Sequence, residues 1–149
     1  TVGHSNHDAE VFVGLLRQHN IEVLVDVRSS PYSRYVPQAN RESLARTLES
    51  AGIGYVWMGE RLGGKPKGAI GDYDKLRASH GFRQGVSSLL GLGAERRVAI
   101  MCSEGDHRQC HRHKLITPAL LDLGVHVVHI QPDGSLVDED KEPKQLALF

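Results

Sequence analysis

The chain has 149 residues, of which 40% are apolar and 24% are charged, and this composition fits one globular domain. It contains no apolar run that could cross a bilayer and no charged-then-apolar leader, and its two cysteines cannot form a disulfide framework. These features favour the reducing cytoplasm over a membrane or secreted location. The net charge is zero, but residues 133–149 hold five acids and two lysines, which leaves the preceding body mildly basic. A mildly basic domain can bind a phosphate or a nucleic acid, but its charge does not require such a ligand.

Strands and helices alternate along the chain. The run "IEVLVDV" is almost continuously apolar, which is typical of a strand buried on both faces of a parallel sheet. Strands are predicted at 1–3, 21–27, 54–57, 96–102 and 124–130. Helices are predicted after residue 6 and at 41–51, 82–92 and 110–123, with loops at 29–40 and 58–72. The order predicts one α/β domain over 1–132, a three-layer α/β/α fold with a mainly parallel sheet, rhodanese-like or Rossmann-like in architecture. An acidic linker and a peptide tail follow over 133–149.

Two of the predicted strands end in polar clusters, "DVRSSPYSR" at 26–34 and "CSEGDHRQCHR" at 102–112. Ligands of open parallel sheets bind beyond the carboxyl ends of the strands, so the two clusters are expected to line one pocket. The candidate catalytic residues are Cys102, Asp26, Glu104 and His111. The candidate anion-binding residues are Arg28, Arg34, Arg108 and Arg112.

The second cluster contains a possible thiol loop. Cys102 to Arg108 spells Cys-x-x-Gly-x-x-Arg, which resembles the phosphate-cradling loop of cysteine phosphatases and the sulfur-carrying loop of rhodaneses. In such a loop the backbone amides and a helix N-terminus attract an anion and lower the pKa of the thiol, which makes it a nucleophile. Gln109 replaces the usual hydroxyl residue, and Glu104 places a negative charge inside the cradle. Both departures weaken the resemblance.

Three other interpretations of the clusters stay open. Cys102 can be a small buried residue, and Asp26 and Arg28 can belong to a structural ion network. A zinc site would have as candidate ligands Cys102, His107, Cys110, His111 and His113. Zinc sites usually have a second ligand pair elsewhere in the chain, which is absent here, so neither a metal nor a cofactor is expected. Arginines and lysines in the loops could hold a nucleic-acid backbone, with Tyr32, Tyr35 and Trp57 stacking on bases.

The blocks "TVGHSN", "VDVRSSPYSR", "ERLGG" and "CSEGDHRQCHR", in this order, resemble a bacterial and archaeal family known as domain of unknown function 488. The resemblance extends from Thr1 to about Gly134 and implies a fold more than an activity. It places Cys102, Glu104, Cys110, His111 and Arg112 on the family's signature positions, with Gly105 and Arg108 outside them. The other signature positions it implies are Gly3, His4, Ser5, Asp26, Arg28, Pro31, Ser33, Arg34, Leu62, Gly63 and Gly64.

The last five residues, "QLALF", resemble the short peptide by which bacterial polymerases and repair factors dock on the sliding clamp. Leu146, Leu148 and Phe149 would enter an apolar pocket while Gln145 sets the register. A tail folded back on its own domain is the alternative. The sequence thus predicts a DNA-linked factor recruited to the clamp, a small cysteine-dependent phosphate- or sulfur-handling enzyme, or a non-catalytic binding module, and it leaves open whether the protein is an enzyme.

Overall fold

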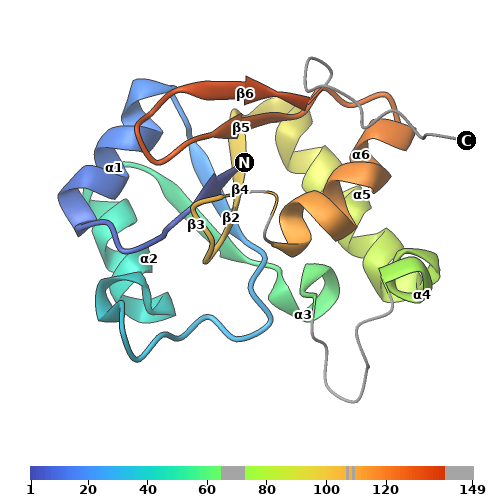
Figure 1. Ribbon diagram of the computed structural model, residues 1–149, viewed down its shortest axis with the longest axis horizontal. Helices are drawn as coiled ribbons and strands as arrows, with labels where there is room; N and C mark the ends of the chain where they lie inside the picture. The colour runs from blue at the N-terminus through green and yellow to red at the C-terminus, as the bar shows by residue number, and fades with distance from the viewer. Residues whose placement is uncertain (65–72, 107, 109, 140–149) are drawn as a thin grey trace, which may run out of the picture.

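The computed structural model describes residues 1–64, 73–106, 108 and 110–139. Its centre is a six-stranded sheet in the order β3-β2-β4-β1-β5-β6 (Figure 1). The strands are β1 Val2–Gly3, β2 Val23–Asp26, β3 Gly54–Trp57, β4 Val98–Cys102, β5 Val128–Ile130 and β6 Leu136–Asp138. Neighbouring strands are parallel except β5 and β6, which form an antiparallel pair. The mainly parallel sheet predicted from the sequence is therefore confirmed.

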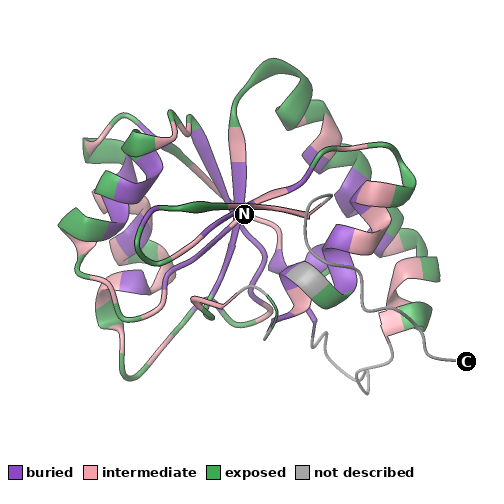
Figure 2. Ribbon diagram, turned by 45° about the horizontal axis from the view of Figure 1, so that its top comes forward, coloured by how far each residue is buried: buried purple, intermediate pink, exposed green. Residues whose placement is uncertain are grey.

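Helices cover both faces of this sheet. They are α1 Ala9–Gln18, α2 Arg41–Ser50, α3 Gly59–Leu62, α4 Tyr73–Ala78, α5 His80–Glu95 and α6 Thr117–Asp122, with a 3-10 turn at Pro37–Ala39 and a π-helical turn at Arg112–Ile116. Figure 2 shows α1 and α2 on one side of the sheet and α5 and α6 on the other. This arrangement is the predicted three-layer α/β/α domain. No helix in the described part of the chain is long and apolar enough to cross a membrane.

Strand β2 supplies both layers of the core because its side chains alternate between the two faces. Val23 and Val25 belong to the cluster that includes Phe82 of α5, whereas Leu24 belongs to the cluster that includes Leu16 of α1. Every residue of β2 is buried, which explains its near-continuous apolar sequence. The exception in composition is Asp26, the last residue of the strand, which is completely buried although it is charged.

Two short elements lie where the sequence predicts a loop or a linker, and a third, α4, lies between the predicted loop 58–72 and the predicted helix 82–92. Helix α3 occupies the start of the predicted loop 58–72, of which residues 65–72 lie outside the described part, and α4 follows directly. Strand β6 lies in the predicted linker and pairs with β5. Its hairpin turns at Asp133 and Gly134, where the glycine has φ of 88° and the aspartate side chain accepts from the Ser135 amide. An Asp-Gly pair is a common hairpin signal, so the sequence contained an indication of this strand.

Candidate functional site

The two polar clusters meet at one edge of the sheet. Strands β2 and β4 are adjacent and parallel, with Asp26 opposite Met101 in the register, so both strands end at the same level. The segments that follow them line a cleft of about 790 Å³. Arg28 from the first cluster and Cys102, Cys110 and His111 from the second all border this space, which we call the cleft.

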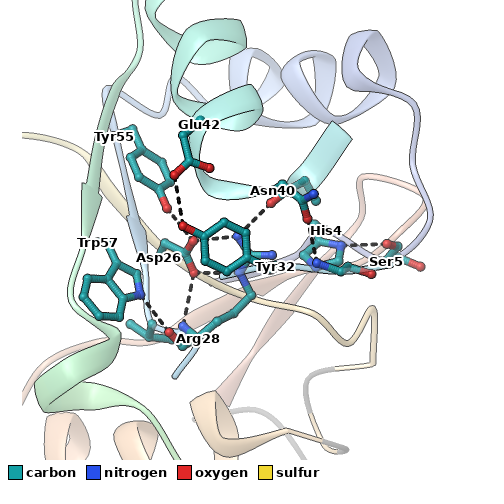
Figure 3. A network of polar contacts seen from close by, with 12 residues as sticks. His4, Ser5, Asp26, Arg28, Tyr32, Asn40, Glu42, Tyr55 and Trp57 are labelled. Carbon is teal, nitrogen blue, oxygen red and sulfur yellow. Dashed lines mark hydrogen bonds and ion pairs between the residues drawn. The ribbon is translucent and has the colours of Figure 1, made fainter. Parts of the chain in front are cut away.

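A buried ion pair forms part of the cleft wall. Arg28 Nε lies 2.9 Å from Asp26 Oδ1, and Arg28 Nη2 lies 2.7 Å from Oδ2, so the guanidinium binds the carboxylate at two points. The Tyr55 hydroxyl also donates to Oδ2, at 2.6 Å (Figure 3). Burial, and after it this hydrogen bond, raises the pKa of Tyr55. Arg28 Nη2 donates further to the Ala39 carbonyl, but the buried Nη1 has no hydrogen-bond partner. Asp26 therefore orients Arg28 and leaves one donor of a cleft residue unused.

The start of α2 fixes the loop that forms the outer edge of the cleft. Asn40 Oδ1 accepts from the Ser33 amide at 2.6 Å, the Arg41 amide donates to the Pro31 carbonyl, and Glu42 accepts from the Tyr32 hydroxyl at 2.9 Å. These consecutive helix residues contact three consecutive loop residues. The loop, although exposed, thus has a defined position against the helix.

Trp57 connects this edge to the ion pair. It is the last residue of β3, and its indole Nε1 donates to the Arg28 carbonyl at 2.8 Å. The Arg41 guanidinium lies over the ring, 4.7 Å from its centroid, in a cation–π contact. Gly59 allows this packing, because a Cβ there would lie 1.7 Å from the Arg28 carbonyl oxygen and 2.4 Å from the indole nitrogen.

The two cysteines of the cleft differ in ionisation. Both are buried and unoxidised, with exposed fractions of 2% for Cys102 and 8% for Cys110. The interaction between the two thiols raises the pKa of Cys102 and lowers that of Cys110. The Cys102 thiol also lies 3.9 Å from the Glu104 carbonyl oxygen, to which it donates. Burial adds to the rise at Cys102, and Arg112 adds to the fall at Cys110 through its charge and its backbone amide. The structure therefore favours Cys110 as the thiolate.

Arg112 is completely buried and has no carboxylate partner among the described residues. Its Nη2 donates to the carbonyls of Glu104 and Gly105 at 2.9 and 3.1 Å, its Nη1 to the Thr1 hydroxyl at 3.4 Å, and its Nε has no partner. An isolated buried charge is costly, so a nearby anion stabilises it. A thiolate at Cys110 provides that anion.

His111 follows Cys110 and borders the same cleft. Its Nε2 lies 2.8 Å from the Val27 carbonyl oxygen, a group that only accepts, so Nε2 carries the proton and Nδ1 carries the lone pair. Burial lowers the pKa of His111, and the Arg112 charge adds to this effect. The imidazole is therefore neutral at pH 7 and can accept a proton at Nδ1. Gly64 packs against it so closely that a Cβ would lie 2.8 Å from the His111 Cβ.

The helix that follows the second cluster begins as a π-helical turn, Arg112–Ile116, before it continues as α6. The Thr117 hydroxyl donates to the Arg112 carbonyl at 2.7 Å and so satisfies one backbone group of the wider turn. Single π-helical turns within helices are rare, and those that occur are frequently found at functional sites. Here the π-helical turn begins at Arg112, directly after the cleft residues Cys110 and His111.

A comparison with protein-family models matches residues 8–117 to the family described as Domain of unknown function DUF488. The chain belongs to the DUF488 family. The match begins just before α1 and ends at the first residue of α6, so it includes both polar clusters of this DUF488 chain. Searches of curated proteins and of solved structures each gave no match.

The predicted site residues of this DUF488 protein divide into those at the cleft and those away from it. Arg28, Cys102, Glu104 and His111 border the cleft, and Asp26 and Arg112 lie buried behind it. Arg34 is exposed and does not border the cleft. Arg108 is also exposed and pairs with Asp106 at 3.1 Å rather than pointing into an anion cradle. The predicted docking residues Gln145, Leu146, Leu148 and Phe149 lie outside the described residues.

Sequence reasoning named Tyr32 and Trp57, which border the cleft, as candidates for stacking on bases, but it did not find the role of Tyr55 or determine which thiol ionises. Tyr55 lies within β3, and it contacts Asp26 because β3 pairs in parallel with β2. The sequence predicts Cys102 as the candidate catalytic thiol, and no sequence pattern shows how the two thiols interact. Among the described residues, no three of the His, Cys, Asp and Glu side chains form a group that could hold a metal ion.

Proposed function

We propose that this DUF488 protein is a cysteine-dependent enzyme that takes a sulfur atom from a small anionic donor, with Cys110 as the nucleophile. The observation that carries the proposal is the buried Arg112 guanidinium, which lacks a carboxylate partner among the described residues and lowers the pKa of Cys110. A cysteine with a lowered pKa beside a cation is the arrangement that nucleophilic thiols require.

In the proposed step the Cys110 thiolate attacks the outer sulfur of a thiosulfate-like donor. A sulfur–sulfur bond forms to Cys110, the sulfur–sulfur bond of the donor breaks, and sulfite leaves with the bonding electron pair. Sulfite needs no proton in order to leave, so the step requires no general acid. The resulting persulfide passes its outer sulfur to an acceptor nucleophile, which restores the Cys110 thiolate.

Sulfur transfer fits the site better than phosphate ester hydrolysis does. The leaving oxygen of a phosphate ester needs a proton from a positioned acid. Asp26 cannot supply one, because its carboxylate accepts hydrogen bonds from Arg28 and Tyr55 and is completely buried. Glu104 borders the cleft, but its side chain is solvent-exposed.

The test measures thiocyanate production from thiosulfate and cyanide, together with the intact mass of the protein after exposure to thiosulfate. We expect turnover and the gain of one sulfur atom, both lost in Cys110→Ser. Cys102→Ala is the matched control: it keeps the nucleophile and shifts the pH profile upward, because Cys110 loses the interaction with the Cys102 thiol. Hydrolysis of a phosphate ester without sulfur transfer, or activity that survives Cys110→Ser, would contradict the proposal.

Docking on the sliding clamp is a second proposal, which rests on the final residues "QLALF" alone. Its test is binding of the full chain to a bacterial sliding clamp by surface plasmon resonance. We expect micromolar binding that disappears when Leu146 and Phe149 are both changed to alanine. The matched control, alanine in place of Lys141 and Lys144, should bind as the parent chain does. Equal binding by both variants, or no binding by the parent, would remove the proposal.

A further inference from the structure

The outer edge of the cleft presents aromatic rings beside positive charge. Tyr32, Trp57 and Tyr73 border the cleft together with Arg41 and Lys114. Tyr32 is 55% exposed although its hydroxyl is held by Glu42, so its ring is fixed and remains accessible to solvent. An ordered, exposed aromatic ring beside arginine is the arrangement on which nucleic-acid bases stack.

The inner wall of the cleft presents an unused cation donor. Arg28 is 4% exposed, borders the cleft, and has a buried Nη1 without a hydrogen-bond partner. Leaving a buried guanidinium N–H unpaired is costly, and a phosphate oxygen would satisfy it. Glu104 is the one carboxylate among the described residues of the cleft lining, against Arg41 and Lys114, while the charge of Arg28 is balanced by Asp26. The cleft therefore favours an anion.

We infer that the cleft binds a nucleotide unit, with its base on the aromatic edge formed by Tyr32 and Trp57 and its phosphate on Arg28 Nη1. The Trp57 indole N–H donates a hydrogen bond to the Arg28 carbonyl, and this contact fixes the aromatic edge relative to the phosphate position. The cleft volume of about 790 Å³ lies within the range of small-ligand sites. The inference rests on the proposed function only in treating this cleft as the functional site. It adds that the acceptor of the Cys110 sulfur would be a molecule with a nucleotide unit.

The single tryptophan of the chain makes a direct measurement possible. Trp57 fluorescence and calorimetry would follow titration of the full chain with adenosine monophosphate, ribose 5-phosphate, adenosine and inorganic phosphate. We expect adenosine monophosphate to bind at least tenfold more tightly than each of the other three, because only it occupies both the aromatic edge and the Arg28 position. Equal binding of ribose 5-phosphate and adenosine monophosphate would overturn the inference, since the base would then contribute nothing.

Two tyrosines of the same loop provide a matched pair of variants. Tyr32→Ala removes a ring that borders the cleft and should weaken adenosine monophosphate binding about tenfold. Tyr35→Ala removes a ring that is 89% exposed and away from the cleft, and should leave the affinity unchanged. Both rings are exposed, so both variants should fold. An equal effect of the two substitutions would contradict the assignment of the base to the cleft.

A short single-stranded oligonucleotide distinguishes the two sources of a nucleotide unit. Tighter binding of the oligonucleotide than of adenosine monophosphate, with the same loss in Tyr32→Ala, assigns the site to a nucleic-acid strand; weaker binding assigns it to a free nucleotide. Cys110→Ser separates this inference from the proposed function. If the protein binds the nucleotide but transfers no sulfur, the inference holds and the proposed function fails. If it transfers sulfur but binds no nucleotide, the proposed function holds and the inference fails.

Discussion

Arg28 and Asp26 form a two-point ion pair across a single intervening residue, with Nε–Oδ1 and Nη2–Oδ2 distances of 2.9 and 2.7 Å. The backbone amide of Arg28 also donates to Oδ1, at 3.1 Å. Neither partner is more than 4% exposed. Each charge depends on the other, because a single buried ion without its partner is far less stable than the pair. The pair positions the end of β2 and the cleft wall together.

Replacement of the buried carboxylate should therefore be severe. Asp26→Asn leaves the Arg28 charge buried without a counter-ion, and we expect a loss of about 3–5 kcal/mol in the free energy of unfolding. Glu22→Gln is the matched control, because Glu22 and Arg96 form an exposed pair at 3.9 Å, and it should cost less than about 1 kcal/mol. Urea unfolding of both variants measures the difference. Similar losses of unfolding free energy in the two variants would show that the buried pair stabilises the protein no more than the exposed pair does.

Alkylation should discriminate between the two thiols. Cys110 should react with iodoacetamide with a midpoint below the ~8.5 of an ordinary thiol, because Cys102 and Arg112 stabilise its thiolate. Mass spectrometry of digested protein locates the label as the pH is varied. Cys102→Ala should raise the midpoint, because it removes the interaction that lowers the pKa of Cys110, and Cys110→Ser should leave the protein almost unlabelled. Preferential labelling of Cys102 would reverse our assignment.

Gly59 and Gly91 should respond to alanine in opposite directions. A Cβ at Gly59 would overlap the Arg28 carbonyl oxygen, so Gly59→Ala must displace the backbone that supports the cleft and should destabilise the protein by several kcal/mol. Gly91 lies in α5 with nothing near its missing Cβ, so Gly91→Ala should stabilise the protein by about 0.5–1 kcal/mol. Thermal denaturation of the two variants gives the comparison. A tolerated alanine at position 59 would contradict the described packing.

The stability of the protein should fall on mild acidification. Burial lowers the pKa of His4 and of His111 below the usual 6.5, so the unfolded chain binds more protons than the folded protein below that pH. The contribution of these two histidines to stability is therefore fully present above about pH 7 and decreases as the pH falls through the histidine range. Urea midpoints measured between about pH 7.5 and 5.5 test this. His111→Gln should reduce the slope, and an identical slope in the variant would exclude His111 as its source.

The sequence was sufficient to predict the relation between Arg28 and Cys102. Two apolar runs that each end in polar residues predict parallel buried strands, and the geometry of such sheets brings their ends together. The same reasoning does not reach side-chain contacts. The opposite pKa shifts of Cys102 and Cys110 depend on how their side chains interact. Arg28 keeps one donor unused because its other donors bind Asp26 and the Ala39 carbonyl. Helix α3 is a single turn, too short to leave a periodic pattern.

The position of β1 has a consequence for how the protein is made. Val2 pairs with Met101 on one side and with Ile130 on the other, so the middle of the sheet joins residues that are very distant along the chain. Such contacts cannot form until most of the polypeptide has left the ribosome, and proteins rich in them fold slowly. During synthesis the β2–β4 half can assemble first, and insertion of β1 beside β5 then completes the sheet as a late event in cotranslational folding.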